Sequence, residues 1–280
     1  MDAYRKRRLV DSAMRGACTA AVLFAVVPLA SLLVYVAAKG LGGLSWTVFT
    51  ELPRPVGETG GGFGNAVLGS LYLVGLACLA GIPVGVLAGV YLAEFGDNRF
   101  GKIVRFSADV MSGVPSIAVG IFVYTLVVLS MRRFSALAGG VALAILMLPT
   151  VTRTTEELVR LVPDSLREAG LALGVPKWRV ILRVVLRTGA PGIATGIMLA
   201  VARAAGETAP LLFTAFGNRF WSASLDKPIG SLPVQIYTYA VSPYDDWHRQ
   251  AQAAALVLVA MVFVLNVGAR LLTHARGDSR

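Results

Sequence analysis

Charged and metal-ligating side chains are scarce in this chain. Only 15% of its 280 residues are Asp, Glu, Lys or Arg, whereas a soluble domain carries about 25%. There are two histidines and two cysteines, and Cys18 and Cys78 lie in separate apolar runs. Because no Cys/His cluster has metal-ligand spacing, a zinc site and a disulfide framework are both disfavoured. No clustered acid, base or metal constellation indicates a membrane-embedded enzyme either.

A phosphate-binding loop for nucleotides is also missing. Residues 57–63 read GETGGGF, which superficially resembles such a loop, but Phe63 stands where a lysine would be required. No Ser or Thr follows it, so the residues that hold the phosphates and Mg²⁺ are absent. We interpret this stretch as a flexible external loop. The chain is therefore expected to bind no cofactor of its own.

Long apolar runs dominate the remaining sequence. Apolar residues make up 56% of the chain and the mean hydropathy is +0.69, which is typical of an all-α integral membrane protein with several spans. Six transmembrane helices are predicted, at residues 17–38, 64–92, 107–131, 137–151, 188–216 and 251–272. A cleaved signal peptide is the alternative for the first run, with Val36 and Ala38 as small residues near a cleavage site. That run exceeds a normal signal core, which favours an uncut span.

The excess of positive charge sets the expected orientation. The formal net charge is +10, which in a soluble protein would suggest nucleic acid as a partner. In a membrane protein it instead indicates cytoplasmic Lys and Arg and attraction to anionic membrane lipid. Of the 26 Lys and Arg residues, 18 fall in the predicted cytoplasmic segments: the head (residues 1–16), residues 99–105, residues 153–187 and the end from 270 to 280, which includes the predicted tail (residues 273–280). Both termini are therefore predicted to be cytoplasmic, although Arg132 and Arg133 form a local external exception.

The longest charged interruption is the cytoplasmic stretch at residues 162–187. Ser165 followed by Glu168 fits a capping box, so a short helix is predicted over 166–173. Gly174 is placed to be the residue just after its end, where a left-handed conformation is common, and Pro176 can begin a second helix. A short capped helix between two spans is the structure that this pattern predicts.

The same stretch resembles the EAA loop of ABC importer permeases, whose pattern is EAA-x3-G-x9-I-x-L-P. Glu168, Ala169, Gly170 and Gly174 stand at the matching positions, and residues 184–187 read VVLR. The sequence departs from the pattern at Gly170, Val184 and Arg187. The resemblance implies that this helix docks on an ATPase subunit and that ATP is used there. An ordinary capped interhelical loop is the alternative interpretation.

Two charges are predicted to lie deep within the fifth span. Arg203 and Glu207 are four residues apart, so on a continuous helix they would share one face and pair. An Arg at a helix centre costs roughly 2.5–3.5 kcal/mol on insertion scales, which makes a functional role the default expectation. We interpret this face, with Thr208 beside it, as part of a substrate path in which Arg203 meets an anion. A purely structural ion pair is the competing interpretation.

A second resemblance lies around these charges. Residues 202–215, ARAAGETAPLLFTA, resemble the fifth-span signature of the PstA family, the A-type permeases of phosphate ABC importers. Residues 113–124 and 233–237 also look like this family, and the resemblance covers roughly 64–266. It implies a type I (MetI-like) permease core over 64–272, in the plasma membrane of a bacterium, that works by alternating access. It further implies a C-type phosphate permease, an ATPase dimer and an extracytoplasmic phosphate-binding protein as partners.

Two other transport functions stay open from the residues alone. A permease for another oxyanion, such as molybdate or sulfate, would have the same architecture. A secondary transporter driven by an ion gradient is disfavoured by the EAA-like loop and by the lack of repeated halves. Nucleic acid is not expected as a partner.

Overall fold

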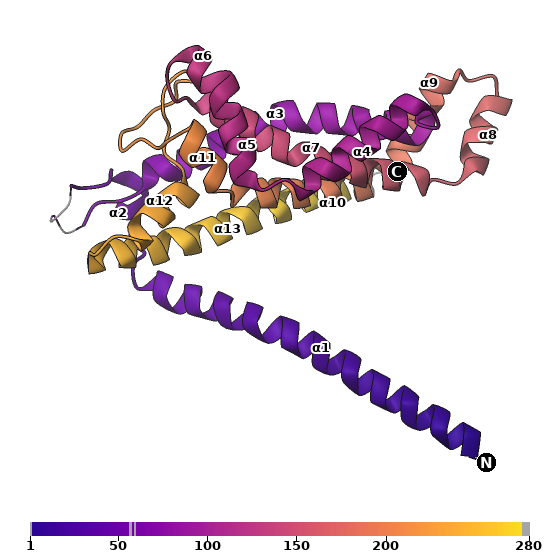
Figure 1. Cartoon of the computed structure of the whole chain (residues 1–280), viewed down its shortest axis with the longest axis horizontal. Helices are drawn as coiled ribbons and strands as arrows, with labels where there is room; N and C mark the ends of the chain where they lie inside the picture. The colour runs from indigo at the N-terminus through magenta and orange to yellow at the C-terminus, as the bar shows by residue number, and fades with distance from the viewer. Residues whose placement is uncertain (1, 56–57, 59, 276–280) are drawn as a thin grey trace.

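The computed structural model of this chain describes residues 2–55, 58 and 60–275, and all the regular secondary structure in them is helical (Figure 1). The all-α prediction is therefore confirmed. The predicted tail beyond Ala275 lies outside the described residues, as do residues 57 and 59 of the glycine-rich loop. The helices are α1 (Asp2–Leu41), α2 (Thr47–Thr50), α3 (Gly64–Phe95), α4 (Arg99–Gly113), α5 (Ser116–Val123), α6 (Leu129–Met131), α7 (Ala136–Arg160), α8 (Asp164–Ala172), α9 (Lys177–Val180), α10 (Leu186–Ala205), α11 (Ala209–Thr214), α12 (Leu232–Ala240) and α13 (Asp245–Ala275). Two π-helical segments, η1 (Tyr124–Val128) and η2 (Ile181–Val185), join α5 to α6 and α9 to α10.

Within the described residues, five helices are long and apolar enough to cross a membrane: α1, α3, α7, the α9–α10 run and α13. A sixth span results if α4 and the helix from Ser116 to Met131 are taken together, although they meet at an angle of 107°. The span predicted at 107–131 is therefore broken near its start, between Gly113 and Ser116. Gly113 ends α4, and Pro115 precedes α5 with an extended ψ of 134°. Because proline lacks a backbone N–H, the helix is interrupted there.

The centre of the molecule is the close pair α3 and α7. Three glycines, Gly81, Gly85 and Gly89, repeat every fourth residue along α3 and face α7. A Cβ at Gly85 would lie 2.8 Å from Val151 side-chain atoms, and one at Gly89 would lie 2.6 Å from the Thr155 Cβ. Small residues at this spacing let two membrane helices approach until their backbones nearly touch. This stripe is what holds α3 against α7.

We expect Gly85→Leu to destabilise the protein by about 3 kcal/mol, because a larger side chain must separate α3 from α7. Gly75 lies on the same helix, but a Cβ added there would meet no other atom within 4 Å, so Gly75→Leu is the matched control. Thermal unfolding of both variants in detergent measures the difference. Equal midpoints for the two variants would contradict the packing role of the glycine stripe.

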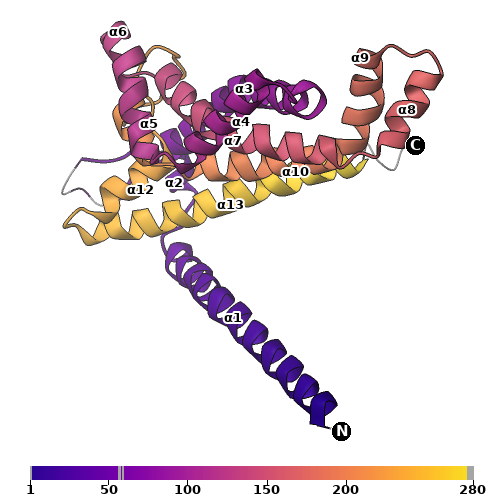
Figure 2. The ribbon, with the colours of Figure 1, turned by 45° about the vertical axis from the view of Figure 1, so that its right-hand side comes forward.

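The helices α10, α11 and α13 complete the core around this pair. Buried side chains from α3, α7, α10 and α11 form one cluster, which includes Leu73, Met147, Ala204 and Leu211. The helix α13 packs on α10, α12 and the end of α1. Figures 1 and 2 show α8 and α9 at one end of the molecule and α2 and α12 at the other.

The first helix stands apart from this core. It forms one 40-residue helix, so the predicted head and the first span are a single element. None of its most apolar window is buried within this chain, and Figures 1 and 2 show it projecting away from the other helices. It meets α13 only near its end, where a Cβ on Gly40 would lie 2.7 Å from the Cβ of Leu256. Its apolar surface is therefore left for lipid or another chain to cover.

The end of the molecule opposite α8 is built from loops and short helices. Arg132, with a φ of 53°, makes a tight turn after α6. Residues 232–240 form the short helix α12 there. There the ring of Tyr239 stacks on Trp247 at 4.4 Å, and burial raises the pKa of Tyr239. These aromatic contacts hold α12 against the start of α13.

Candidate functional site

The helix predicted in the EAA-like loop is present as α8, but its start differs from the prediction. The helix begins at Asp164, and Pro163 precedes it without any side-chain cap. Ser165 therefore lies inside the first turn, and the predicted capping box is wrong. Pro163 sets this start because its fixed φ and missing N–H suit the beginning of a helix. Similarly, Pro176 precedes α9, which begins at Lys177.

The end of α8 is a complete Schellman motif. The N–H of Gly174 donates to the carbonyl of Leu171 at 2.9 Å, and the N–H of Val175 donates to the carbonyl of Gly170 at 3.2 Å. Gly174 has a φ of +73°, a conformation that costs other residues energy. The sequence prediction for Gly174 is confirmed. Together these bonds turn the chain from α8 into α9 with a defined angle.

Gly170 is the position where the family pattern has alanine. In this structure a Cβ at Gly170 would lie 2.9 Å from the Cγ2 of Val180. The absence of a side chain at Gly170 therefore lets α8 and α9 approach closely. The departure from the pattern has a local packing reason, and it leaves the spacing of the loop unchanged.

The outer surface of α8 and α9 is apolar and open. Leu173 is 83% exposed, and Leu166, Leu171 and Trp178 are also exposed. Glu168 and Ala169 lie on the same helix and are exposed too. An apolar patch of this kind at a polar end of a membrane protein is typical of a protein interface. The arrangement can present one carboxylate and several apolar side chains to a partner.

The second predicted site, Arg203 and Glu207, has a different geometry from the one expected. The helix α10 ends at Ala205, so Glu207 lies in the break before α11 and not on the same helix face. The Nε of Arg203 is 3.9 Å from the Oε1 of Glu207, and the side chains are 54% and 16% exposed. The pair is therefore loose, and Arg203 keeps most of its donors available. Thr208, the residue before α11, lies directly beside it.

The helix ends there for reasons that are visible in the sequence. Gly206 weakens a helix, and Pro210 cannot donate to the carbonyl of residue 206. The last turn tightens. The N–H of Gly206 donates to the carbonyl of Arg203 at 3.2 Å, and the N–H of Glu207 donates to the carbonyl of Ala204 at 3.2 Å. Arg203 consequently sits in the final turn of α10, where a cation is favoured by the helix dipole. The helix of the span predicted at 188–216 therefore ends at Ala205, and a separate short helix follows from Ala209.

A more deeply buried charge lies elsewhere and was missed by the sequence prediction. The side chain of Glu156 on α7 is 3% exposed and is held by three arginines. Its Oε1 lies 2.6 Å from the Nε of Arg105 and 3.1 Å from Arg160, and its Oε2 lies 3.2 Å from Arg153. The predicted fourth span ends at residue 151, which leaves this segment in the predicted loop. The spacing of residues 153, 156 and 160 on one helical face could have revealed the cluster.

We expect Glu156→Gln to destabilise the protein by about 3–5 kcal/mol, because it leaves arginines without their buried partner. Glu157 is the next residue on the same helix and is exposed, so Glu157→Gln is the matched control. Thermal unfolding in detergent compares the two variants. If both unfold like the wild type, the buried cluster does not contribute to stability.

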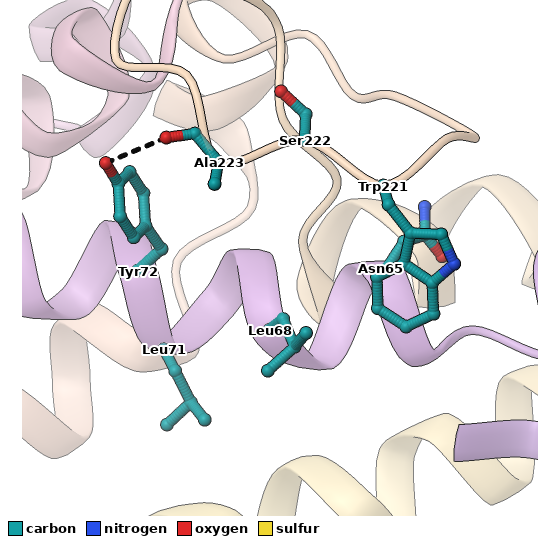
Figure 3. A pocket seen from close by; sticks show the side chains of 7 residues that line it. All are labelled: Asn65, Leu68, Leu71, Tyr72, Trp221, Ser222 and Ala223. Atoms are coloured by element: carbon teal, nitrogen blue, oxygen red, sulfur yellow. Dashed lines mark hydrogen bonds between the residues drawn. The ribbon is translucent and has the colours of Figure 1, made fainter. Parts of the chain in front are cut away.

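A cavity of about 620 Å³ lies near the start of α3, far along the chain from the predicted site residues. Figure 3 shows Trp221 and Asn65 among the residues that line it, and the Tyr72 hydroxyl donates to the Ala223 carbonyl at 3.0 Å. The amide nitrogen of Asn65 donates to the carbonyl of Asn218 at 2.6 Å. The cavity is mostly apolar and contains no charged side chain among its lining residues. It therefore adds no anion-binding group to the candidate site.

Comparison with known proteins identifies the family. Residues 81–275 match the family described as "Binding-protein-dependent transport system inner membrane component". The chain is 48% identical over 254 residues to the phosphate transport system permease protein PstA of Yersinia pestis, covering 90% of this chain and 86% of that protein. It is 45% identical over 266 residues to the PstA protein of Haemophilus influenzae, covering 95% and 94% respectively.

The fold comparison agrees with this match. A chain of the MetNI methionine ABC transporter in an inward-facing form superposes with a TM-score of 0.60 at 17% identity, covering 75% of this chain and 95% of that one. The predicted MetI-like permease fold is therefore confirmed. The matched names are those of transport permeases, which confirms the prediction of a multi-pass transport subunit and not an enzyme. The chain belongs to the family of binding-protein-dependent transport system inner membrane components, and within that family to the PstA permeases.

Proposed function

We propose that this chain is one of the two permease subunits of an ATP-driven importer of inorganic phosphate. Phosphate is proposed as the substrate because this chain matches permeases that are named for phosphate transport, along nearly their whole length. The fold alone does not select a substrate, because a methionine transporter shares it. The partners proposed are a C-type permease, an ATPase dimer and an extracytoplasmic phosphate-binding protein.

Arg203 is proposed to meet phosphate in the translocation path. Its side chain is 54% exposed, and its guanidinium offers a planar fork of donors that suits phosphate oxygens. Glu207, at 3.9 Å, is close enough to attract Arg203 but too distant to occupy it with a short hydrogen bond. Conduction needs binding that is strong enough for entry and weak enough for release. The loose pair supports this balance.

The surface of α8 and α9 is proposed to dock on the ATPase. Its exposed apolar side chains, with Glu168 among them, would be covered by that partner. Movement of the ATPase dimer would then displace α8 and reorient the spans, so that the path opens alternately to each side. In this proposal ATP binds and is hydrolysed on the partner.

The proposed orientation places α8 and both termini in the cytoplasm. We expect a cysteine at Ala223 to be labelled from outside intact cells by an impermeant reagent, because this loop lies at the opposite end from α8 (Figure 1). A cysteine at Ser165, which is exposed on α8, should react only after the membrane is permeabilised. The native Cys18 and Cys78 are first replaced by serine. Labelling of position 165 in intact cells would invert the orientation.

The substrate is tested by stimulation of ATP hydrolysis in the assembled complex. We expect the phosphate-loaded binding protein to raise the hydrolysis rate of the complex reconstituted in lipid vesicles. The same binding protein offered sulfate or molybdate should leave the rate at its basal level. Stimulation by sulfate or molybdate, with none by phosphate, would assign the chain to another oxyanion importer.

A further inference from the structure

The cytoplasmic end of α3 is held by cations from four other helices. Its last carbonyls lack partners within the helix, and its negative dipole end favours cations. Arg105 of α4 donates to the carbonyls of Leu92 at 2.7 Å and Gly96 at 2.9 Å. Arg160 of α7 lies 3.5 Å from the Leu92 carbonyl, and Lys177 of α9 lies 3.3 Å from the Glu94 carbonyl. The fourth cation, Arg167, comes from α8.

Arg167 joins α8 to both central helices at once. Its Nε lies 3.0 Å from the Oε1 of Glu94 at the end of α3, and the two side chains are 18% and 6% exposed. Its Nη2 donates to the carbonyl of Val159, near the end of α7, at 2.8 Å. Its Nη1 donates to the carbonyl of Val162 and contacts Asp164, which is 87% exposed. Because α8 otherwise packs mainly on α9 and η2, Arg167 is its direct connection to α3.

The central pair continues from this connection to the candidate anion site. The glycine stripe keeps α3 and α7 in contact along their length, so a displacement at their cytoplasmic ends is carried by a tightly packed pair. Leu73 of α3 and Met147 of α7 share a buried cluster with Ala204 of α10 and Leu211 of α11. Ala204 is next to Arg203, and Leu211 follows Glu207 by four residues.

We infer that the buried pair Arg167–Glu94 is the link that transmits movement of α8 into the central helices. The inference rests on the proposed function, in which a partner ATPase moves α8. Arg167 is a positioning residue: it touches neither substrate nor nucleotide. Its planar fork reaches a carboxylate and two carbonyls together, which a lysine cannot reproduce. Loss of a purely structural contact would prevent assembly. Loss of this link would instead separate ATP hydrolysis from transport in an assembled complex.

The experiment uses the whole complex in lipid vesicles and compares Arg167→Ala, Glu94→Gln and the double variant. Each single variant leaves one buried group without its partner and should lower the unfolding midpoint, but both should still assemble and hydrolyse ATP at the basal wild-type rate. Stimulation of hydrolysis by the loaded binding protein should fall about tenfold or more, within the range of coupling between linked sites. The double variant should lose no more than Arg167→Ala, since both changes break the same link. Asp164→Asn, which removes only the exposed partner of Arg167, is the matched control and should behave as the wild type.

Three results separate the possibilities. Wild-type stimulation in Arg167→Ala and Glu94→Gln would overturn the link. Loss of assembly in both variants would also overturn it, because the pair would then serve only to stabilise the structure. If the wild-type complex responds to sulfate or molybdate in place of phosphate, the proposed substrate is wrong. Arg167→Ala is then compared with the wild type in the presence of that anion, and this comparison still tests the link.

Discussion

Replacing Arg203 with glutamine should reduce phosphate uptake by roughly 100-fold or more, because losing about two charge-assisted hydrogen bonds to the anion costs about 3 kcal/mol or more. Glutamine keeps a similar length and a donor but removes the charge. The side chain is half exposed at the end of α10, and its contact with Glu207 is a loose one at 3.9 Å, so the complex should still assemble without it. Labelled phosphate uptake into reconstituted vesicles, together with an assembly check, measures the effect.

Two further variants make the Arg203 result specific. Arg203→Lys keeps the charge and should retain more uptake than Arg203→Gln, although it loses the planar fork. Glu207→Gln should do less damage than Arg203→Gln, because Glu207 sits 3.9 Å away and Arg203 keeps its charge. Full uptake by an assembled Arg203→Gln complex would remove Arg203 from the path. The structural ion pair would then be the better account.

Gly174→Val should uncouple ATP hydrolysis from transport while the protein still inserts and folds. Gly174 has a φ of +73° and open space around a Cβ, so the cost comes from the backbone and not from a collision. A left-handed residue costs roughly 1–2 kcal/mol, and more when it is β-branched. That cost would favour other geometries at the end of α8 and lower the docking-competent fraction by a factor of about 5–30.

The control for this prediction is Gly174→Asn, because asparagine tolerates the left-handed region and can end a helix in the same way. The measurement is the number of phosphate ions taken up per ATP hydrolysed. This ratio should fall in Gly174→Val and stay near the wild-type value in Gly174→Asn. An unchanged ratio in Gly174→Val would mean that the turn after α8 does not set the docking geometry.

The sequence was most informative where one local rule decides the structure. The apolar runs located the spans, and Gly174 marked a helix end because glycine alone adopts its φ without strain. It was less informative where two local signals compete. Ser165 and Glu168 fit a capping box, yet Pro163 makes α8 begin at Asp164, ahead of the predicted start. Hydropathy also averaged over the breaks at Pro115 and Gly206, since each break lies within a run that is apolar overall.

The charged residues also show where the sequence is informative and where it is not. A charge inside an apolar run is conspicuous, so Arg203 and Glu207 stood out. Glu156 did not, because its neighbours Arg153 and Arg160 made the segment look like a solvated loop. Its third partner, Arg105, comes from α4, and no local pattern places that helix beside α7. The link between Arg167 and Glu94 likewise joins residues far apart in the chain.

The central claim, that this chain is a permease subunit of a phosphate importer, is tested most directly by transport. The complex of this chain with its partner permease and ATPase is placed in vesicles with the binding protein and labelled phosphate. Uptake should require ATP, the binding protein and this chain, and excess sulfate or molybdate should not compete with it. Uptake that proceeds without this chain, or that sulfate or molybdate abolishes, would contradict the claim.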